Sequence, residues 1–172
     1  MATAQAPAPS LYGSVVFLKL QDFARRSATE QTRLRAQLEA VAAVVIAELD
    51  PAERVVLDAA DGAAIVVFAN PRGALTLAQS AMNAIAAKLP LSAGLNHGAL
   101  QLGRSRKKSE EGMVGDGIAV AAAVAQHAAS GRLLASRAFR EALAEVAPGA
   151  ESALVPAGSF TDSGLRTHHI YS

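Results

Sequence analysis

The sequence contains no cysteine, no long apolar run and no large excess of either charge. Without cysteine the chain cannot form disulfides, thiolate metal sites or a cysteine nucleophile, which suits a reducing cytoplasm, and we expect a cytoplasmic location. The longest apolar run, residues 41–47, is far shorter than the roughly 20 residues that span a bilayer, so we expect no membrane span in this segment. The net charge of +1 gives no global electrostatic argument for nucleic acid, membrane or acidic partners.

The residues that are present indicate one folded domain. The chain has 172 residues and 51% hydrophobic content, which is enough for a single buried core. Its first ten residues are rich in alanine and proline and lack the basic start and apolar stretch of a secretory signal. We therefore expect a disordered leader over residues 1–12 and a domain over residues 13–172.

The first half of the domain alternates strand and helix patterns. Residues 14–20 are β-branched and aromatic, which predicts a buried strand. Apolar residues at steps of three and four predict one helix from Thr29 to just before Pro51 and another over residues 71–88. Between these helices, two short apolar runs over residues 54–59 and 63–68 flank Ala60-Asp61-Gly62. Asp-Gly is a strong signal for a hairpin turn, so we expect a hairpin with Asp61 at its tip.

The second half continues this alternation and completes the prediction of fold class. The expected elements are, in chain order, strands 91–96 and 99–102 with a turn at His97-Gly98, a polar loop 103–112, a helix 118–129 ended by Gly131, a strand 132–135, a helix capped by Ser136 that runs to about Glu145, and strands 154–161 and 167–171. Strand pairs that alternate with helices predict an α+β fold, a sheet covered by helices and close to the ferredoxin-like core.

Several short motifs occur in an order that is itself informative. They are FLKLQDF at residues 17–23, LDAADG at 57–62, GLNHG at 94–98, GDGIAVAAA at 115–123, GRLLAS at 131–136, and the strand that closes the chain at 164–171. In this order they resemble the landmarks of the class III adenylate and guanylate cyclase catalytic domains, and the resemblance covers nearly the whole chain. It implies a ferredoxin-like class III nucleotidyl cyclase fold, with a central, mostly antiparallel sheet flanked by helices.

The resemblance also implies a metal site that this chain has kept only as a remnant. Cyclases of this family use two carboxylates to hold the divalent ions that bridge the nucleotide phosphates. Asp61 matches one of them, but the other position falls on Lys19, whose charged ammonium has no lone pair for a metal. Asp22 could replace it only by a register shift that puts Arg26 at the aromatic position of Phe23.

We therefore hypothesise that a Lys19–Asp61 salt bridge replaces the metal. The alternative is that Lys19 points to solvent and Asp61 serves only as a hairpin residue.

Other positions implied by the resemblance are also degenerate. The transition-state asparagine and arginine of the family fall on Ala119 and Ala123, which cannot donate hydrogen bonds to developing charge. The base-selecting lysine and aspartate fall on Leu57 and Gly112. Together with the loss at Lys19, these replacements predict no useful catalytic rate from a site built of this chain alone.

Three further features each have a functional and a structural interpretation. Gly115-Asp116-Gly117 could cradle a phosphate at a helix N-terminus, or form a tight turn with Asp116 as the N-cap, which we favour. The basic segment 104–108, with Arg104, Arg106, Lys107 and Lys108, could bind nucleic acid or an acidic partner, but no aromatic residue interleaves it, which favours a solvated loop. The four histidines, His97, His127, His168 and His169, lack the spacing of a metal site.

These observations lead to one expected function and two alternatives. We expect a non-catalytic signalling, regulatory or dimerisation module, a pseudoenzyme that could retain weak nucleotide binding, and that forms a homodimer or pairs with a cyclase-like chain. The first alternative is one half of a cyclase heterodimer, completed by its partner; only then do we expect Mg²⁺ or Mn²⁺ as a cofactor. The second is a nucleic-acid or acidic-protein module that uses the basic segment 104–108.

Overall fold

The computed structural model describes residues 11–84, 89–104 and 111–172. Its helices are α1 (Ala28–Ile46), α2 (Pro71–Ala84), α3 (Asp116–His127) and α4 (Arg137–Val146). Its strands are β1 (Leu11–Leu20), β2 (Arg54–Ala59), β3 (Gly62–Phe68), β4 (Leu91–Arg104), β5 (Glu111–Val114), β6 (Leu133–Ser136), β7 (Pro156–Thr161) and β8 (Thr167–Tyr171). Within the described ranges, no helix combines the length and the apolar character that crossing a membrane requires.

The strands form one mixed sheet in the order β2-β3-β1-β4-β6-β8-β7, and β5 pairs with β4 alone. All neighbouring strands are antiparallel except β4 and β6, which run parallel. The first six elements, β1 to β4 with α1 and α2, give the strand order β2-β3-β1-β4, which is that of a ferredoxin-like unit. The predicted α+β fold with a mostly antiparallel sheet is confirmed.

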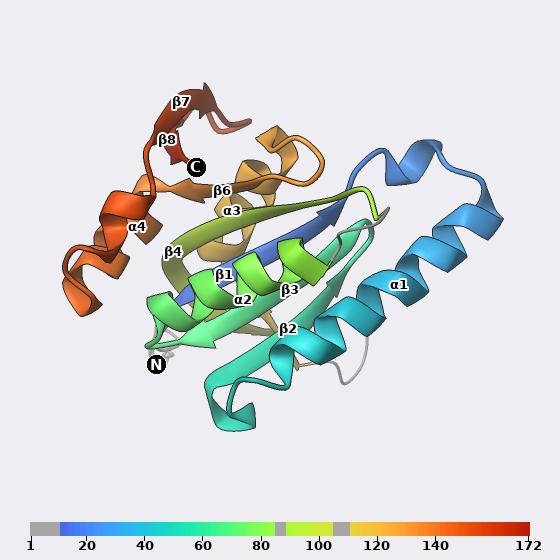
Figure 1. Cartoon of the computed structure of the whole chain (residues 1–172), viewed down its shortest axis with the longest axis horizontal. Helices are drawn as coiled ribbons and strands as arrows, with labels where there is room; N and C mark the ends of the chain where they lie inside the picture. The colour runs from blue at the N-terminus through green and yellow to red at the C-terminus, as the bar shows by residue number, and fades with distance from the viewer. Residues whose placement is uncertain (1–10, 85–88, 105–110) are drawn as a thin grey trace, which may run out of the picture.

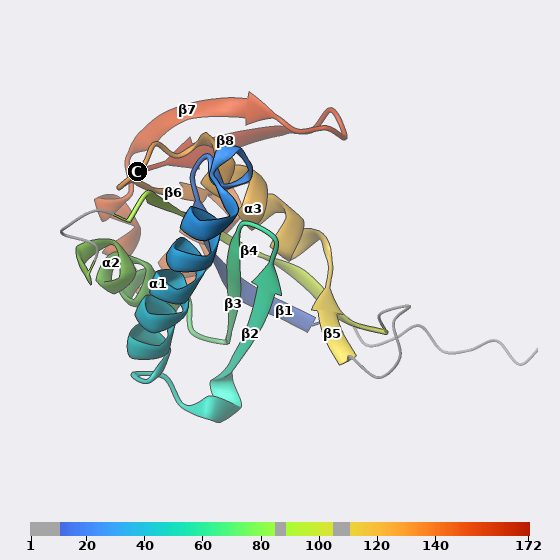
Figure 2. The same ribbon diagram turned by 90° about the vertical axis from the view of Figure 1, so that its right-hand side faces the viewer.

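Helices cover both faces of this sheet. Helices α1, α2 and α4 bury their apolar side chains against one face, together with Val16, Leu18 and Leu20 of β1. Helix α3 packs on the opposite face, against Val15 and Phe17 of the same strand. Figure 2 shows α1 and α2 on one side of the sheet and α3 on the other. The alternation of β1 side chains between two cores explains why this strand is apolar along nearly its whole length.

Glycines let α3 lie directly on β4. A Cβ atom at Gly94 would stand 2.3 Å from the carbonyl oxygen of Ala121, and one at Gly98 would stand 3.1 Å from the Cα of Gly117. A side chain at Gly94 would therefore force the helix away from the strand. Glycine at both positions allows the backbones of β4 and α3 to approach each other closely.

The same observation corrects the prediction for this region. His97-Gly98 was expected to be a turn between two strands, but β4 runs without interruption from Leu91 to Arg104. The prediction was wrong because a glycine within a strand can mark the close approach of another backbone as well as a turn. The strand that follows, β5, lies at Glu111–Val114, partly inside the segment predicted as a loop.

The other boundaries agree closely with the sequence patterns. The β2–β3 hairpin turns at Ala60 and Asp61, and β8 spans the predicted residues. Ser136 accepts a hydrogen bond from the backbone N–H of Phe139, as its predicted role as a cap requires. Strand β1 begins at Leu11, so it takes in the last two residues of the expected leader, whose other residues lie outside the described ranges.

Candidate functional site

Lys19 and Asp61 meet at one end of the sheet. Lys19 is the second-last residue of β1, and Asp61 occupies the turn between β2 and β3. The Lys19 Nζ atom lies 2.7 Å from Asp61 Oδ2, with side-chain exposures of 19% and 36% respectively. The two side chains therefore form a partly buried, charge-assisted hydrogen bond, which is the geometry that the salt-bridge hypothesis requires.

The backbone around Asp61 is fixed from two sides. The N–H of Leu20 donates to the carbonyl of Asp61 at 2.8 Å, and a Cβ at Gly62 would stand 2.1 Å from the carbonyl oxygen of Leu18. From α1, the guanidinium of Arg35 donates to the carbonyls of Ala59 and Gly62. Arg35 was not singled out in the sequence, because a side chain that braces a hairpin 24 or more residues away leaves no local pattern.

These residues do not fit the divalent metal that the cyclase fold implies. The Lys19 ammonium donates a hydrogen bond to the carboxylate that would have to ligate the ion, and an ammonium has no lone pair to offer. Among the described residues, no group of three or more histidine, aspartate or glutamate side chains could hold a metal ion. Asp22 is exposed in a left-handed conformation (φ 56°) beyond the end of β1, and no described contact joins it to Asp61.

The positions expected to act on the transition state carry no polar side chain. Ala119 is exposed on α3, and Ala123, one turn later, packs beside the small core under β8. Leu57 is half-buried on β2, and Gly112 lies on β5 opposite Gly103. β2 is at one edge of the sheet and β5 is beyond β4.

The glycine pair at the start of α3 has a packing role. Gly115 is the N-cap with φ 146°, and a Cβ on it would stand 2.7 Å from the carbonyl oxygen of Ala99. A Cβ on Gly117 would stand 2.9 Å from the same oxygen. The N-cap role predicted for Asp116 was wrong, because Asp116 is the first helical residue and its carboxylate makes no capping hydrogen bond.

Asp116 instead pairs with a residue 50 positions away. Its two carboxylate oxygens accept hydrogen bonds from the two terminal nitrogens of Arg166, at 2.7 and 2.8 Å. This hydrogen-bonded guanidinium lowers the pKa of Asp116. A fixed negative charge therefore stands in the first turn of α3, where an anion such as phosphate would otherwise be favoured.

The β7–β8 turn extends this charged cluster. Asp162 accepts hydrogen bonds from His168 at 2.7 Å, from the backbone N–H of Arg166 at 2.9 Å and from the Arg166 Nε at 3.0 Å. The His168 hydrogen bond first, and then the backbone N–H of Arg166, lower the pKa of Asp162 to about 2. The ring of Phe160 stacks on that of His127, with centroids 4.0 Å apart, and contacts the tilted ring of His168, with centroids 5.2 Å apart. The sequence reasoning missed this cluster, because its members come together only when β7 and β8 pack on α3.

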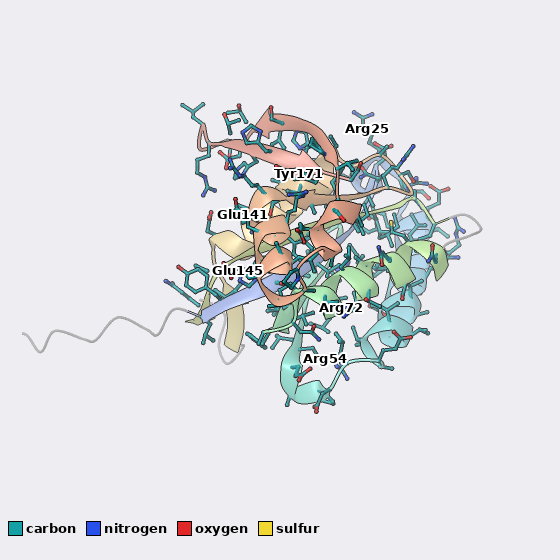
Figure 3. The ribbon with its side chains drawn as sticks, turned by 60° about the vertical axis from the view of Figure 1, so that its left-hand side comes forward. Arg25, Arg54, Arg72, Glu141, Glu145 and Tyr171 are labelled. Carbon is teal, nitrogen blue, oxygen red and sulfur yellow. The ribbon has the colours of Figure 1, made fainter. Side chains whose placement is uncertain are left out.

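The other two histidines lie apart from this cluster. The Nδ1 of His97 is 3.1 Å from the Ser14 Oγ, and burial lowers the pKa of His97 although nearby Glu145 raises it. Glu145 lies on the exposed side of α4, one turn after Glu141 (Figure 3). His169 is exposed on β8. Within the basic segment 104–108, only the backbone of Arg104 belongs to the described residues.

Comparisons with known proteins identify the architecture. No family model and no curated protein sequence matches the chain. Among solved structures, the guanylate cyclase domain of RhGC from Catenaria anguillulae, determined with GTP, gives a TM-score of 0.76 at 15% identity over 95% of this chain and 97% of that chain. The adenylyl cyclase CyaB from P. aeruginosa gives 0.73 at 13% identity over 95% and 94%.

A third structure is described as a non-canonical dimeric guanylyl cyclase domain. It comes from the RhoGC fusion protein of the aquatic fungus Blastocladiella emersonii, and gives a TM-score of 0.69 at 14% identity over 95% of this chain and 97% of that chain. Each comparison covers almost the whole of both chains, and the identities are low enough that only the fold is established. The chain has the fold of the class III adenylyl and guanylyl cyclase catalytic domains.

Proposed function

We propose that this chain is a catalytically degenerate cyclase-like domain that acts as a non-catalytic signalling, regulatory or dimerisation module in the cytoplasm. The observation that carries the proposal is the 2.7 Å contact between Lys19 and Asp61. A carboxylate that is neutralised by an internal ammonium gains little from a divalent ion, and the ammonium repels that ion electrostatically. The domain therefore needs no resident Mg²⁺ or Mn²⁺.

The chemistry of α3 supports the same conclusion. The positions that would stabilise charge on the transferring phosphoryl group are Ala119 and Ala123, and neither side chain can donate a hydrogen bond. Loss of one such donor typically costs about a hundredfold to a thousandfold in rate. Two lost donors and a lost metal ligand together leave no useful turnover in a site built from this chain, even if a nucleotide still binds weakly.

The proposed dimerisation surface is the part of the sheet that α3 leaves open. On the face that carries α3, Val55, Leu57 and Ala59 of β2 are half-buried, as is Phe68 at the end of β3. Helix α3 packs on β4 and β1, and within the described residues no helix covers β2 on this face. We propose that a second copy, or a cyclase-like partner chain, covers this surface, which we call the β2 face.

A nucleotide titration tests the proposed loss of catalysis. The purified domain is titrated with ATP and with GTP, with and without Mg²⁺ or Mn²⁺, while calorimetry follows binding and chromatography follows products. We expect no cyclic product and no metal-dependent gain in affinity. Metal-dependent turnover by the domain alone would overturn the proposal. Turnover only after a complementary cyclase chain is added would instead favour the heterodimer half, and strongly salt-dependent nucleic-acid binding would favour the role of the basic segment 104–108.

Sedimentation tests the β2 face separately. Leu57→Glu places a charge at the centre of this surface and should shift the domain from dimer to monomer. Val44→Glu is the matched control, because Val44 is 67% exposed on α1 and outside the surface. A parent protein that remains monomeric at all concentrations, or a Leu57→Glu variant that still dimerises like the control, would contradict the proposed interface.

A further inference from the structure

The strands at the two ends of the sheet differ in how their outer edges are protected. Figure 1 shows β2 and β7 at opposite ends of the strand order. β7 begins with Pro156 and has a bulge between Pro156 and Gly158, and both features hinder pairing with a further strand. β2, with the sequence RVVLDA, has no proline, lysine or bulge, and β3 is its only partner among the described strands. The outer edge of β2 is therefore suited to pairing with another strand.

The hydrogen bonds of the neighbouring strands identify which residues of β2 point outward. The N–H of Leu20 donates to the carbonyl of Asp61, which places the odd-numbered residues of β3 in hydrogen bonds with β1. The even-numbered residues of β3 therefore bond to the odd-numbered residues of β2, as in the pair of Gly62 and Ala59. The even-numbered residues of β2 direct their backbone N–H and carbonyl groups toward the free edge, and they are Arg54, Val56 and Asp58.

The side chains of these residues are complementary to a second copy of the same strand. Val56 is 40% exposed, and residues of opposite charge, Arg54 and Asp58, stand on either side of it. Neither charged residue forms a salt bridge within the described part of the chain. The Nε of Arg54 donates to the carbonyl of Leu49, which leaves the terminal nitrogens of the guanidinium for a partner. The strand thus carries one positive and one negative end around an exposed apolar centre.

One antiparallel register between two copies uses all of these features. With Val56 opposite Val56 of the second copy, each Arg54 is opposite an Asp58 on the same face of the sheet, and a two-fold axis generates the ion pair twice. A shift by two residues would place a charged side chain opposite Val56, and a shift by four would place like charges opposite each other. On the other face, the same register sets Val55 of each copy beside Leu57 of the other. The apolar surfaces of the two β2 faces then become continuous.

We propose that two copies of this chain pair through the free edges of β2, as antiparallel strands that continue the sheet across a two-fold axis. The backbone groups of residues 54, 56 and 58 form the ladder, and the reciprocal pairs of Arg54 and Asp58 fix its register. This contact lies at the edge of the strand, goes beyond the proposed covering of the β2 face, and does not depend on the loss of catalysis. Because the paired segments are short, we expect a dissociation constant on the order of 100 µM.

Charge reversal tests the register. Sedimentation equilibrium measures dimerisation of the whole chain and of the single variants Arg54→Asp and Asp58→Arg, each of which places like charges opposite each other. Each variant should dimerise at least about tenfold more weakly than the parent. In an equimolar mixture of the two variants, opposite charges face each other again, so the affinity should return to within about threefold of the parent. Arg137→Asp and Glu141→Arg, which reverse exposed charges on α4, are the matched controls and should leave dimerisation unchanged.

Hydrogen exchange tests the strand pairing itself. The amide of Val56 should exchange more slowly as the protein concentration rises through the dissociation constant, whereas the amide of Leu57, which bonds to β3 in each copy, is the internal control. A parent that stays monomeric up to about 1 mM would overturn the proposal. So would a mixture that dimerises no better than the single variants, or exchange at Val56 that does not depend on concentration.

The outcome for the edge is distinguishable from the outcome for the proposed function. A dimer that Leu57→Glu abolishes and that both charge reversals leave intact would overturn the edge contact and assign dimerisation to the β2 face. Restored dimerisation in the mixture, together with metal-dependent turnover in the nucleotide titration, would support the edge contact and overturn the proposed loss of catalysis.

Discussion

The Lys19–Asp61 ion pair should make a measurable contribution to folding stability. Its two side chains are 19% and 36% exposed, so the pair lies between a surface ion pair and a buried one. We consider Lys19→Met, which keeps most of the aliphatic chain but removes the charge, together with Asp61→Asn and the double variant. In Lys19→Met the carboxylate of Asp61 loses its charged partner while remaining partly desolvated.

The expected size follows from the burial of the pair. Exposed ion pairs contribute about 0.2–1 kcal/mol, and breaking a buried pair costs about 3–5 kcal/mol. We therefore expect a coupling free energy of about 1–2 kcal/mol between Lys19 and Asp61 in the double-mutant cycle, measured by urea unfolding at neutral pH. If Lys19→Met destabilises the domain by the same amount, its Tm should fall by about 2–8 °C for a domain of this size.

A second ion pair in the same chain is the control. Arg137 and Glu141 are four residues apart on α4, with side chains 64% and 66% exposed, and their coupling should not exceed about 0.5 kcal/mol. A Lys19–Asp61 coupling as small as that of the control pair would refute the reasoning. It would mean that the two side chains merely approach each other, and that the hairpin is fixed by its backbone contacts alone.

Three further outcomes follow from the structure. Gly94→Ala should lower the free energy of unfolding, measured in urea, by about 3 kcal/mol, because the added Cβ would clash with the carbonyl oxygen of Ala121. An unchanged urea midpoint in the variant would contradict this close packing of α3 on β4. The pKa of His97 is lowered below 6.5 in the folded protein, so neutral His97 contributes to folding stability above pH 6.5, and this contribution is lost as the pH falls through the folded pKa. His97→Gln should therefore flatten the dependence of the free energy of unfolding on pH. The same pH dependence in the variant would exclude His97 as its source. The pKa of Asp116, measured by NMR, should lie below 3.8 and rise in Arg166→Gln; no rise would show that the pair is not formed in solution.

The fold could be predicted from sequence where local signals are strong. The Asp61-Gly62 pair and the apolar runs around it predicted the β2–β3 hairpin, whose turn lies at Ala60 and Asp61, and Ser136 marked the start of α4. The prediction of a turn at His97-Gly98 was wrong for a physical reason. The sequence does not reveal whether a glycine in a strand pattern allows a tight turn or allows a helix to pack closely on the strand. The contact of Gly98 with Gly117, which settles the question, joins residues 19 apart in the chain.

The candidate site was predictable only in part. Family resemblance placed Lys19 beside Asp61, and the structure has them in contact. No local pattern indicated that Arg35 would hold the hairpin, or that Arg166 would reach Asp116 at the start of α3. Such contacts depend on how helices and hairpins pack together, so they could not be read from the spacing of residues along the chain.

Direct measurement of Mn²⁺ binding tests the central claim, that the Lys19 ammonium takes the place of the metal. Electron paramagnetic resonance reports free Mn²⁺ during titration of the parent domain, the Lys19→Asp variant, and a Lys19→Asp/Asp61→Asn control. We predict no specific binding to the parent, binding to Lys19→Asp, where two carboxylates face each other, and loss of that binding in the control. Specific binding of Mn²⁺ to the parent that Asp61→Asn abolishes would contradict the account.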